Sequence, residues 1–428
     1  MKPVVQLALD FVELDRALKV AQEAVAGGVD WLEAGTPLIK SEGLDAVRAL
    51  RKAFPNHTIV ADMKIMDAGR VEAEAAAKAG ADIVDVLGAA SDATIRECVE
   101  AARHYGLRIV VDTIAVEDVV KRAREVEAMG ADYVSVHVAV DEQMHGATPF
   151  EKLKQVAKAV SIPVAVAGGI HSESAAEAVK CGASIVIVGG AIIKAQDATG
   201  AARQIKRAVT TGKKPSTLLY KRVSGDTIRE ALEKVSTANI SDAMHRTGDL
   251  EGIVPISTGL KMVGTAVTVR TYPGDFAKPV EAIDAAEKGQ VIVVDAGGVG
   301  PAIWGELATH SCLQKGVCGV VVDGAVRDTG EIRKMGFPAF SRLLMPTAGE
   351  PKGFGEIGVP VLVGGVRVRP GDWLVGDDDG VVAIPKEKAV EFANRAMDVL
   401  EKENRIRKEI DAGSTLARVT ELLRWEKK

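Results

Sequence analysis

Short apolar runs rich in β-branched residues alternate with stretches rich in Ala, Glu and Lys through the first 210 residues. A short run of this composition is typical of a buried strand, and the longer stretches have the composition of helices. Each predicted strand, its helix and two short loops take up about 25 residues. The eight predicted strands cover residues 4–10, 29–34, 58–64, 83–87, 108–113, 133–138, 163–167 and 185–188.

An internal repeat accompanies this alternation. Gly-Val-Asp at 28–30, Gly-Ala-Asp at 80–82 and 130–132, and Gly-Ala-Ser at 182–184 each precede an even-numbered predicted strand. Their spacings of 52, 50 and 52 residues equal two strand–helix units, and Gly readily ends a helix in the left-handed conformation. Eight such units predict a closed (β/α)8 TIM barrel. An open doubly wound sheet is the alternative, although no dinucleotide-binding glycine pattern follows the first strand.

The pattern changes in the second half. A polar, proline-interrupted stretch predicts a linker at 212–224, between a first domain at 1–211 and a second at 225–428. The last predicted strands of the second domain are too close together for helices between them, so we expect a mixed α/β domain with an antiparallel part. From residue 386 the mixed charge predicts a helical tail with a solvated face or an oligomer contact. A helix is expected at 227–234, and strands near 263–270, 291–295, 317–323, 359–368 and 373–384.

Ionisable residues end most of the predicted barrel strands. In a barrel of this type, the chemistry lies at the C-terminal ends of the strands. One such residue is ordinarily a surface group, but six strands that end this way, and two that end in Gly-Gly, are hard to explain by solvation alone. These positions are Asp10, Glu33, Asp62 with Lys64, Asp85, Asp112, His137, Gly168-Gly169 and Gly189-Gly190.

The densest cluster combines Asp62, Lys64 and Asp67. Asp62 and Lys64 point to the same face of a strand, because side chains alternate with a period of two. A Lys held between carboxylates stays cationic and can stabilise an enolate oxygen or deliver a proton. Asp67 lies beyond the strand and can reach the same cavity or that of a neighbouring subunit. A structural salt bridge is the alternative interpretation.

Other strand ends suggest a metal ion and an acid/base group. Glu33 and Asp62 lie on adjacent predicted strands and can together hold a hard cation such as Mg²⁺ through oxygen ligands and water. His137 is a candidate acid/base, with a hydrogen-bonded core histidine as the alternative.

Glycine pairs end the last two predicted strands. Gly168-Gly169 and Gly189-Gly190 leave room for backbone N–H groups to approach an oxyanion, and barrels often bind phosphate at these two loops. We therefore expect a sugar phosphate or a nucleotide monophosphate as substrate.

The first half resembles a known family across residues 1 to about 210. The motifs that carry the resemblance are Leu7-Ala8-Leu9-Asp10, Glu33-Ala34-Gly35-Thr36-Pro37, the segment from Asp62 to Gly69, Val86-Leu87-Gly88-Ala89-Ala90 and the segment from Ala165 to Ile170. They resemble the 3-hexulose-6-phosphate synthases of the orotidine-monophosphate-decarboxylase superfamily. This resemblance implies a reversible, Mg²⁺-dependent aldol condensation of D-ribulose 5-phosphate with formaldehyde to D-arabino-3-hexulose 6-phosphate.

The same resemblance implies roles for the matching residues. Glu33 and Asp62 hold the metal, and Lys64 helps to stabilise the enediolate. His137 moves the proton at C1, and Asp10 belongs to the catalytic set. Asp67 completes the site of another subunit in a dimer, and the two glycine pairs hold the phosphate.

A sister activity is the alternative for the barrel. Decarboxylases of the superfamily act on keto-gulonate phosphate or orotidine phosphate and usually carry an Arg just after the last strand. This chain reads Gly189-Gly190-Ala191-Ile192 at that point. The missing Arg favours the synthase, with a 3-keto-L-gulonate-6-phosphate decarboxylase as the alternative.

The second half contains one chemically suggestive set, Glu306 with Arg327 and Asp328. Asp can coordinate a divalent ion while Arg grips a 2-oxo acid through its carboxylate, and a buried Arg–Asp pair is the alternative. The run from Asn239 to Met244, Asp295-Ala296-Gly297-Gly298 and the run from Asp323 to Asp328 resemble the RraA-like family over about 225–385.

That second resemblance implies a swivelling β/β/α domain. The aldolase branch of the family cleaves 4-hydroxy-4-methyl-2-oxoglutarate to pyruvate and decarboxylates oxaloacetate with Mg²⁺ or Mn²⁺. By this resemblance, Asp328 binds the metal, Glu306 orients metal-bound water and Arg327 binds the pyruvyl carboxylate. Other members only bind and inhibit a ribonuclease, so a non-catalytic regulatory module is the alternative.

Composition and charge narrow the classes of binding partner that this protein can have. The 54 basic and 59 acidic residues give a net charge of −5, which argues against nucleic-acid binding and against a polybasic membrane contact. Four Cys without a C-x-x-C pair indicate a reduced protein rather than a disulfide scaffold. With no signal peptide and no run of about 18 apolar residues, we expect a cytoplasmic homo-oligomer, with a barrel dimer and an RraA-like trimer.

Overall fold

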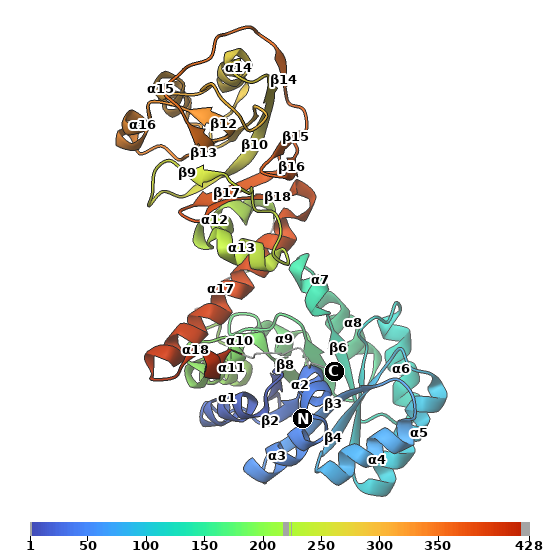
Figure 1. Cartoon of the computed structure of the whole chain (residues 1–428). Helices are drawn as coiled ribbons and strands as arrows, with labels where there is room; N and C mark the ends of the chain where they lie inside the picture. Colours follow the sequence, from blue (N-terminus) through green and yellow to red (C-terminus); the bar gives the residue numbers. More distant parts are fainter. Residues whose placement is uncertain (1, 217–221, 224, 421–428) are drawn as a thin grey trace, which may run out of the picture. The chain divides into compact units, whose positions relative to one another are not determined.

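The computed structural model describes residues 2–216, 222–223 and 225–420, which form two compact units. Of the described residues, the first unit contains 2–216 and 401–420, and the second unit is Arg222–Leu400. Figure 1 shows the helices and strands of both units. This grouping differs from the predicted division into 1–211, 212–224 and 225–428 at its C-terminal end, and the exact domain limits stay a prediction.

Eight parallel strands close the first unit into a barrel (Figure 1). Each strand pairs with the next, and β8 returns to β1. The predicted (β/α)8 barrel is therefore confirmed. The strands are β1 (Val4–Leu9), β2 (Trp31–Ala34), β3 (Thr58–Ile65), β4 (Ile83–Leu87), β5 (Arg108–Asp112), β6 (Tyr133–His137), β7 (Val164–Ala167) and β8 (Ile185–Val188).

Helices cover the outside of the barrel. Gly80 and Gly130, two of the repeated glycines, end α4 and α6 with φ values of 100° and 97°, as the repeat predicted. The helices are α1 (Leu14–Ala26), α2 (Thr36–Glu42), α3 (Asp45–Ala53), α4 (Gly69–Ala79), α5 (Asp92–Tyr105), α6 (Val119–Met129), α7 (Val140–Met144), α8 (Phe150–Ala159), α9 (Ala175–Lys180), α10 (Gly190–Ile193) and α11 (Ala198–Thr211).

The barrel interior changes from apolar to polar along the strands. One cluster of buried side chains includes Trp31, Val60, Ile83 and Val110. Two residues further along each of these strands, the interior-facing position is a carboxylate, because strand side chains alternate with a period of two. The buried carboxylates at these positions are Glu33, Asp62, Asp85 and Asp112, and Gln6 is a buried polar residue of β1.

A mixed sheet with helices forms the second unit, as predicted. The parallel strands are β10–β13, whereas β9, β14 and β17 pair antiparallel to their neighbours. The strand order is β18-β17-β10-β11-β12-β13-β9, with β14 beside β10. The bounds are β9 (Val254–Pro255), β10 (Met262–Thr271), β11 (Val291–Asp295), β12 (Gly319–Val326), β13 (Ala339–Leu344), β14 (Gly355–Ile357), β17 (Trp373–Asp377) and β18 (Gly380–Ile384), with helices α12 (Ile228–Lys234), α13 (Thr237–Ala243), α14 (Ala277–Ala285), α15 (Glu306–Lys315) and α16 (Thr329–Met335).

Several strand predictions in this unit were wrong in detail. The single strand expected at 373–384 is the antiparallel pair β17 and β18. The single strand expected at 359–368 is a hairpin of β15 (Val361–Val363) and β16 (Val366–Val368), because Gly364 and Gly365 turn the chain with positive φ. Strand β13 was not predicted. Its apolar run is short and is followed by Ser341 and Arg342, so the run lacks the length that marks the other strands.

The charged tail forms helix α17 (Ala389–Asp411), and a solvated face is the wrong description for much of it. Ala393 and Ala396 are buried in the second unit. Arg405 and Glu409, which belong to the first unit, are only 4% and 7% exposed. Their charges are buried as ion pairs, which a pattern of mixed charge does not reveal. None of the helices that the structure describes is long and apolar enough to cross a membrane.

Candidate active site

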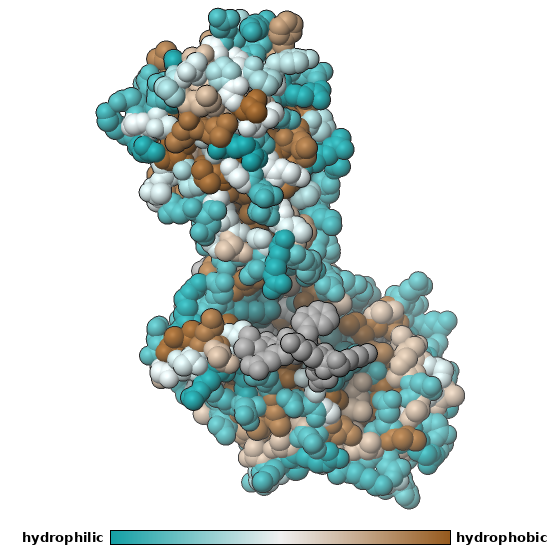
Figure 2. Space-filling view, viewed as in Figure 1, coloured by the Kyte–Doolittle hydropathy of each residue, from teal (hydrophilic) through white to brown (hydrophobic). Residues whose placement is uncertain are grey.

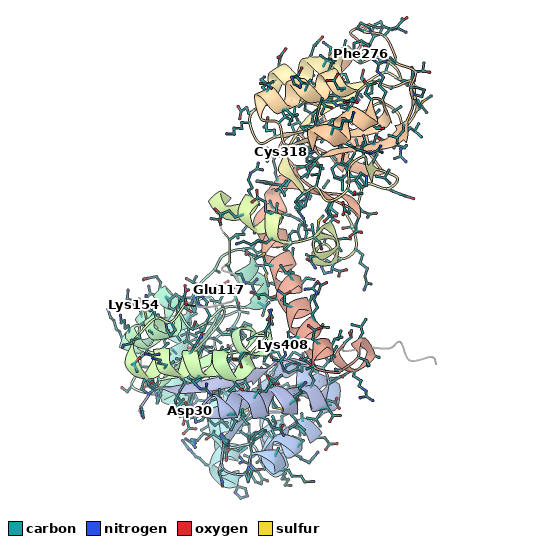
Figure 3. All side chains as sticks on the ribbon, turned by 90° about the vertical axis from the view of Figure 1, so that its left-hand side faces the viewer. Asp30, Glu117, Lys154, Phe276, Cys318 and Lys408 are labelled. Carbon is teal, nitrogen blue, oxygen red and sulfur yellow. The ribbon has the colours of Figure 1, made fainter. Side chains whose placement is uncertain are left out.

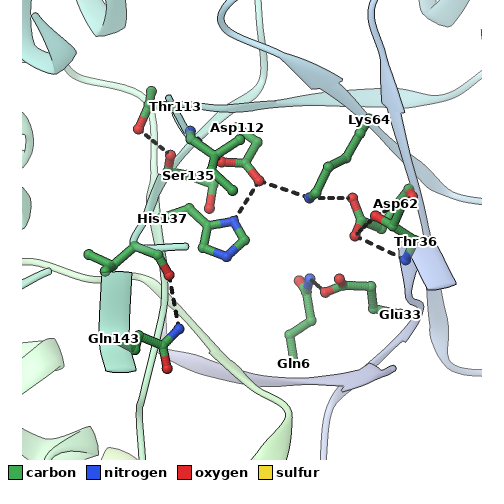
Figure 4. Close-up of polar contacts among 12 residues, drawn as sticks. Gln6, Glu33, Thr36, Asp62, Lys64, Asp112, Thr113, Ser135, His137 and Gln143 are labelled. Atoms are coloured by element: carbon green, nitrogen blue, oxygen red, sulfur yellow. Dashed lines mark hydrogen bonds and ion pairs between the residues drawn. The ribbon is translucent and has the colours of Figure 1, made fainter. Parts of the chain in front are cut away.

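The ends of β3, β5 and β6 bring four polar side chains into one network (Figure 4). The Nζ atom of Lys64 lies 2.9 Å from Oδ1 of Asp62 and 3.0 Å from Oδ2 of Asp112. The same Asp112 oxygen lies 2.7 Å from Nδ1 of His137. The side chains of Lys64 and His137 are 23% and 19% exposed, whereas both carboxylates are buried. The network thus joins three predicted site residues, Asp62, Lys64 and His137, because Asp112 contacts both Lys64 and His137.

Strand β3 bends locally to present Lys64. Its pairing with β4 is regular through Ala61 and resumes at Ile65, so the residues between them form a bulge. Lys64 has a φ of 45°, a left-handed conformation that costs a residue with a side chain about 1–3 kcal/mol. The contact between Asp62 and Lys64 is present as expected, but it is made across an irregular stretch and not by simple alternation.

The surrounding carboxylates keep Lys64 protonated. Burial would lower the pKa of Lys64, but the charges of Asp85, Asp62 and Asp112 outweigh it and raise that pKa well above its ordinary value. Burial would raise the pKa of Asp112, but its hydrogen bond with His137 and the charges of His137 and Lys64 lower it. Lys64 is therefore a fixed cation, and Asp112 is a carboxylate that can orient the His137 ring.

Two further carboxyl groups lie deep in the barrel. Glu33 accepts a hydrogen bond of 2.5 Å from Gln6, and burial together with the charges of Asp62 and Asp10 raises its pKa. Asp85 is 8% exposed, and its Oδ1 atom has no hydrogen-bond partner among the described residues. Burial and the neighbouring carboxylates raise the pKa of Asp85 as well. The interior thus carries more carboxyl groups than Lys64 alone can balance.

This surplus fits a divalent cation at Glu33 and Asp62. Their mutual repulsion is among the causes of the raised pKa of Glu33, and a cation between them would remove it. The Oδ2 atom of Asp62 is oriented by a 2.6 Å hydrogen bond from the hydroxyl group of Thr36. In the part of the chain that the structure describes, no three or more His, Cys, Asp or Glu side chains are arranged to hold a metal. Water and substrate oxygens would therefore have to complete the coordination shell.

Asp67 does not join the network. Its side chain is exposed and accepts a 2.7 Å hydrogen bond from the backbone N–H of Ala68. It lines a surface depression of about 280 Å³ with Arg70, Thr94 and Glu97 among its other residues. Asp67 thus makes no contact with the Lys64 network among the described residues, and its role in the site of another subunit stays a prediction.

The glycine pairs lie where backbone approaches closely. Gly168 has a φ of 113°, and a Cβ atom there would lie 2.8 Å from the carbonyl oxygen of Val138. A Cβ atom on Gly189 would lie 3.2 Å from Oδ2 of Asp10, so this loop borders the exposed Asp10 carboxylate. The Nζ atom of Lys194 lies 3.2 Å from the position of such an atom on Gly190. A cation therefore accompanies the second glycine pair.

Sequence reasoning missed Gln6, Thr36 and Lys194 and assigned no role to Asp112 or Asp85. Gln6 could have been found as a polar residue inside the apolar run of β1. Lys194 stands four residues after Gly190, a spacing that brings side chains to one face of a helical turn. Thr36 carries no comparable signal.

In the second unit, Glu306, Arg327 and Asp328 line a cavity of about 440 Å³ together with Leu307, Gly330 and Glu331. The Nε atom of Arg327 lies 3.5 Å from Oδ2 of Asp328, and the two side chains are 43% and 40% exposed. The alternative of a buried Arg–Asp pair is therefore wrong. The backbone N–H of Glu306 donates to the same Asp328 oxygen at 3.3 Å. The predicted set is together and open to a ligand.

Both units match known protein families. The chain belongs to the orotidine 5'-phosphate decarboxylase / HUMPS family, whose model matches residues 3–205. Residues 237–383 match the RraA-like family, described as Aldolase/RraA. The chain is therefore a fusion of the two domains that the motifs indicated.

Curated relatives of the first unit are aldolase-type enzymes. The 3-hexulose-6-phosphate synthase of Mycobacterium gastri is 42% identical over 204 residues, which are 48% of this chain and 98% of that protein. The synthase of Bacillus subtilis strain 168 is 42% identical over 208 residues, 48% of this chain and 99% of that protein. RraAS2 of Streptomyces coelicolor has a solved structure that is 30% identical and covers 44% of this chain and 100% of its own, with a TM-score of 0.39. With these synthases as relatives, the chain is an enzyme.

Proposed function

We propose that the first unit catalyses the reversible aldol condensation of D-ribulose 5-phosphate with formaldehyde to D-arabino-3-hexulose 6-phosphate. The observation that carries this proposal is the Lys64 cation held between Asp62 and Asp112, with His137 on the same Asp112 oxygen. An aldol reaction of this kind needs a base at C1 and positive charge at the enediolate oxygens, and this network offers both. The 42% identity to the synthases supports it.

His137 is the proposed base. Because Asp112 is a carboxylate, Nδ1 of His137 donates to it, which leaves Nε2 as an acceptor. Nε2 takes the proton from C1 of ribulose 5-phosphate, and the electron pair of the broken C–H bond forms the enediolate. C1 then attacks the carbon of formaldehyde, and the new alkoxide takes a proton back from His137. The ammonium group of Lys64 stabilises the enediolate throughout.

Glu33 and Asp62 are the proposed ligands of Mg²⁺ or Mn²⁺, which when bound supplies positive charge beside the ketose oxygens. Asp10 is the remaining member of the proposed catalytic set and lies at the barrel mouth between Gly35 and Gly189.

The backbone amides of Gly168, Gly169, Gly189 and Gly190 are proposed to bind the substrate phosphate. The ammonium group of Lys194 beside Gly190 supports this assignment, because it adds a positive charge at the second pair.

The first expected result is metal-dependent consumption of formaldehyde. The full chain with ribulose 5-phosphate and Mg²⁺ should consume formaldehyde, excess EDTA should reduce the rate to background, and added Mg²⁺ or Mn²⁺ should restore it. Omission of ribulose 5-phosphate is the control. Release of CO2 from 3-keto-L-gulonate 6-phosphate, without consumption of formaldehyde, would instead support the decarboxylase alternative.

For the second unit we propose a divalent-metal aldolase or decarboxylase of 2-oxo acids. The open cavity at Glu306, Arg327 and Asp328 supports it, because a guanidinium group beside two carboxylates suits a 2-oxo acid and a metal ion. Arg327 would bind the substrate carboxylate, and Asp328 and Glu306 would hold the ion and its water. The amides after Gly305 would face the enolate oxygen. The competing proposal is a non-catalytic regulatory or ribonuclease-inhibitor-like binding module.

A second expected result separates these two proposals. In the full chain carrying Lys64→Ala, which removes the barrel chemistry, pyruvate should form from oxaloacetate or 4-hydroxy-4-methyl-2-oxoglutarate with Mg²⁺ or Mn²⁺. Arg327→Ala should lower this rate roughly 100-fold, whereas Arg367→Ala, at an exposed position of β16, should not change it. No metal-dependent pyruvate release from the Lys64→Ala chain would favour the binding module.

We propose a homo-oligomer with a barrel dimer and a trimer of the RraA-like unit. Large apolar side chains are exposed on the second unit, including Leu307 at 76%, Phe354 at 58% and Leu344 at 53%, and Figure 2 shows hydrophobic surface there. On the first unit, Met66 and Val71 are exposed on either side of Asp67. Apolar surface of this kind is typical of subunit contacts.

A further inference from the structure

We infer that Arg405, on the C-terminal part of α17, holds the phosphate-binding segment of the barrel in place. Arg405 is 4% exposed. It donates to the carbonyl oxygens of Ala195 and Gln196 at 3.0 and 3.4 Å, and to both carboxylate oxygens of Glu23 at 2.9 and 3.0 Å. Its Nε atom donates to Glu409 at 2.6 Å. All three guanidinium nitrogens are therefore used within the first unit.

The stretch of helix that carries Arg405 is anchored at more than one point. Figure 3 marks this stretch by Lys408. Glu409, which is 7% exposed, also lies 3.5 Å from the ammonium group of Lys19 on α1. Two buried charges of the helix thus face groups of α1 and of the link between α10 and α11. A buried, multiply bonded Arg is costly to place unless every donor is satisfied, as it is here.

The segment that Arg405 contacts is short and has little internal support. Helix α10 has four residues, and its turn is closed by bonds to the carbonyl oxygens of Gly189 and Gly190. One isolated turn is unstable by itself, because fixing its backbone costs more than its few hydrogen bonds return. Ala195 and Gln196 follow directly, and their carbonyl oxygens are the groups that Arg405 binds. The guanidinium group therefore fixes the C-terminal end of this turn.

This segment carries the second glycine pair and Lys194. The inference rests on the proposed function, in which these groups bind the phosphate of ribulose 5-phosphate. Arg405 makes no contact with the Lys64–Asp112–His137 network, whose members lie on β3, β5 and β6. It is therefore a positioning residue, and its loss should weaken substrate binding while the chemical step continues.

The test is the steady-state kinetics of the full chain carrying Arg405→Met. We expect the KM for ribulose 5-phosphate to rise about 5- to 20-fold, with kcat within about twofold of the parent. Arg405→Lys should give an intermediate KM, because it keeps the charge but not the forked geometry. Arg407→Met is the matched control, since Arg407 is on the same helix and its ion pair with Glu403 is at the surface. It should keep the parental KM.

Loss of Arg405 leaves the buried Glu409 carboxylate without its main partner. The double variant Arg405→Met/Glu409→Gln is therefore measured together with Arg405→Met. Circular dichroism shows whether each variant is folded. An unchanged KM in a folded variant, a fall in kcat alone, or unfolding of both variants would overturn the inference. Failure of the proposed function is separate, because the parent chain would then not consume formaldehyde. In that case calorimetric binding of ribulose 5-phosphate decides: tighter binding by the parent than by the variants supports the inference, and equal or absent binding overturns it.

Discussion

Lys64→Ala is expected to lower kcat/KM for the aldol condensation roughly 1000-fold in a chain that remains folded. Lys64 is the cation on which Asp62 and Asp112 converge. Without it, the enediolate loses its ammonium partner, and the two carboxylates are left facing each other. Asp112 would then hold a proton more readily, so it would also orient His137 less well. Both effects act on the chemical step, so kcat should fall more than KM rises.

Formaldehyde consumption measures this effect, and circular dichroism shows whether the variant is folded. Lys52→Ala is the matched control, because Lys52 is exposed on α3, away from the strand ends. It should keep the parental rate. A folded Lys64→Ala chain within tenfold of the parent would contradict the role assigned to Lys64.

Asp85→Asn is expected to stabilise the first unit at neutral pH and to have little effect near pH 4. Burial and neighbouring carboxylates raise the pKa of Asp85 well above its ordinary 3.8 in the folded chain. A group of this kind contributes its full stability below pH 3.8, and that contribution is lost as the pH rises toward the folded-state pKa. The loss is about 1.4 kcal/mol for each pH unit in that window. Asn carries no charge, so the free energy of unfolding of the variant does not fall in this way as the pH rises.

Thermal unfolding of parent and variant between pH 4 and pH 8 measures this difference. The gap in melting temperature should widen in favour of the variant as the pH rises, and then level off. Gln22→Ala, at an exposed position of α1, changes no ionisable group and should show no such trend. A gap that stays constant with pH would show that Asp85 does not titrate differently in the folded chain.

Strand positions and the list of strand-end residues were predictable because both depend on local pattern. Apolar runs of β-branched residues marked the eight barrel strands, and the polar residue at each strand end pointed to the rim where chemistry lies. The same pattern failed at β13 and at the β15–β16 and β17–β18 hairpins, where short runs and tight turns hide the strand boundaries.

The partners of each candidate residue were not predictable. Asp112 stood among the strand ends, but its place between Lys64 and His137 depends on how three strands are staggered in a closed barrel. The bulge in β3 and the positive φ of Lys64 change the direction of one side chain without a mark in the sequence. Arg405 is 382 residues from its partner Glu23, so no local pattern could connect them.

The sequence by itself determined the two domain families, the eight-unit barrel and the residue types available at its rim, because composition, periodicity and motifs are local properties. Only the tertiary structure decided which of these residues meet. It placed Lys64, Asp112 and His137 in one network, kept Asp67 out of it, and buried a helix of mixed charge that reads as solvated. The physical reason is that contacts between distant residues depend on barrel closure and strand register, and a buried charge becomes stable only once its partner is in place.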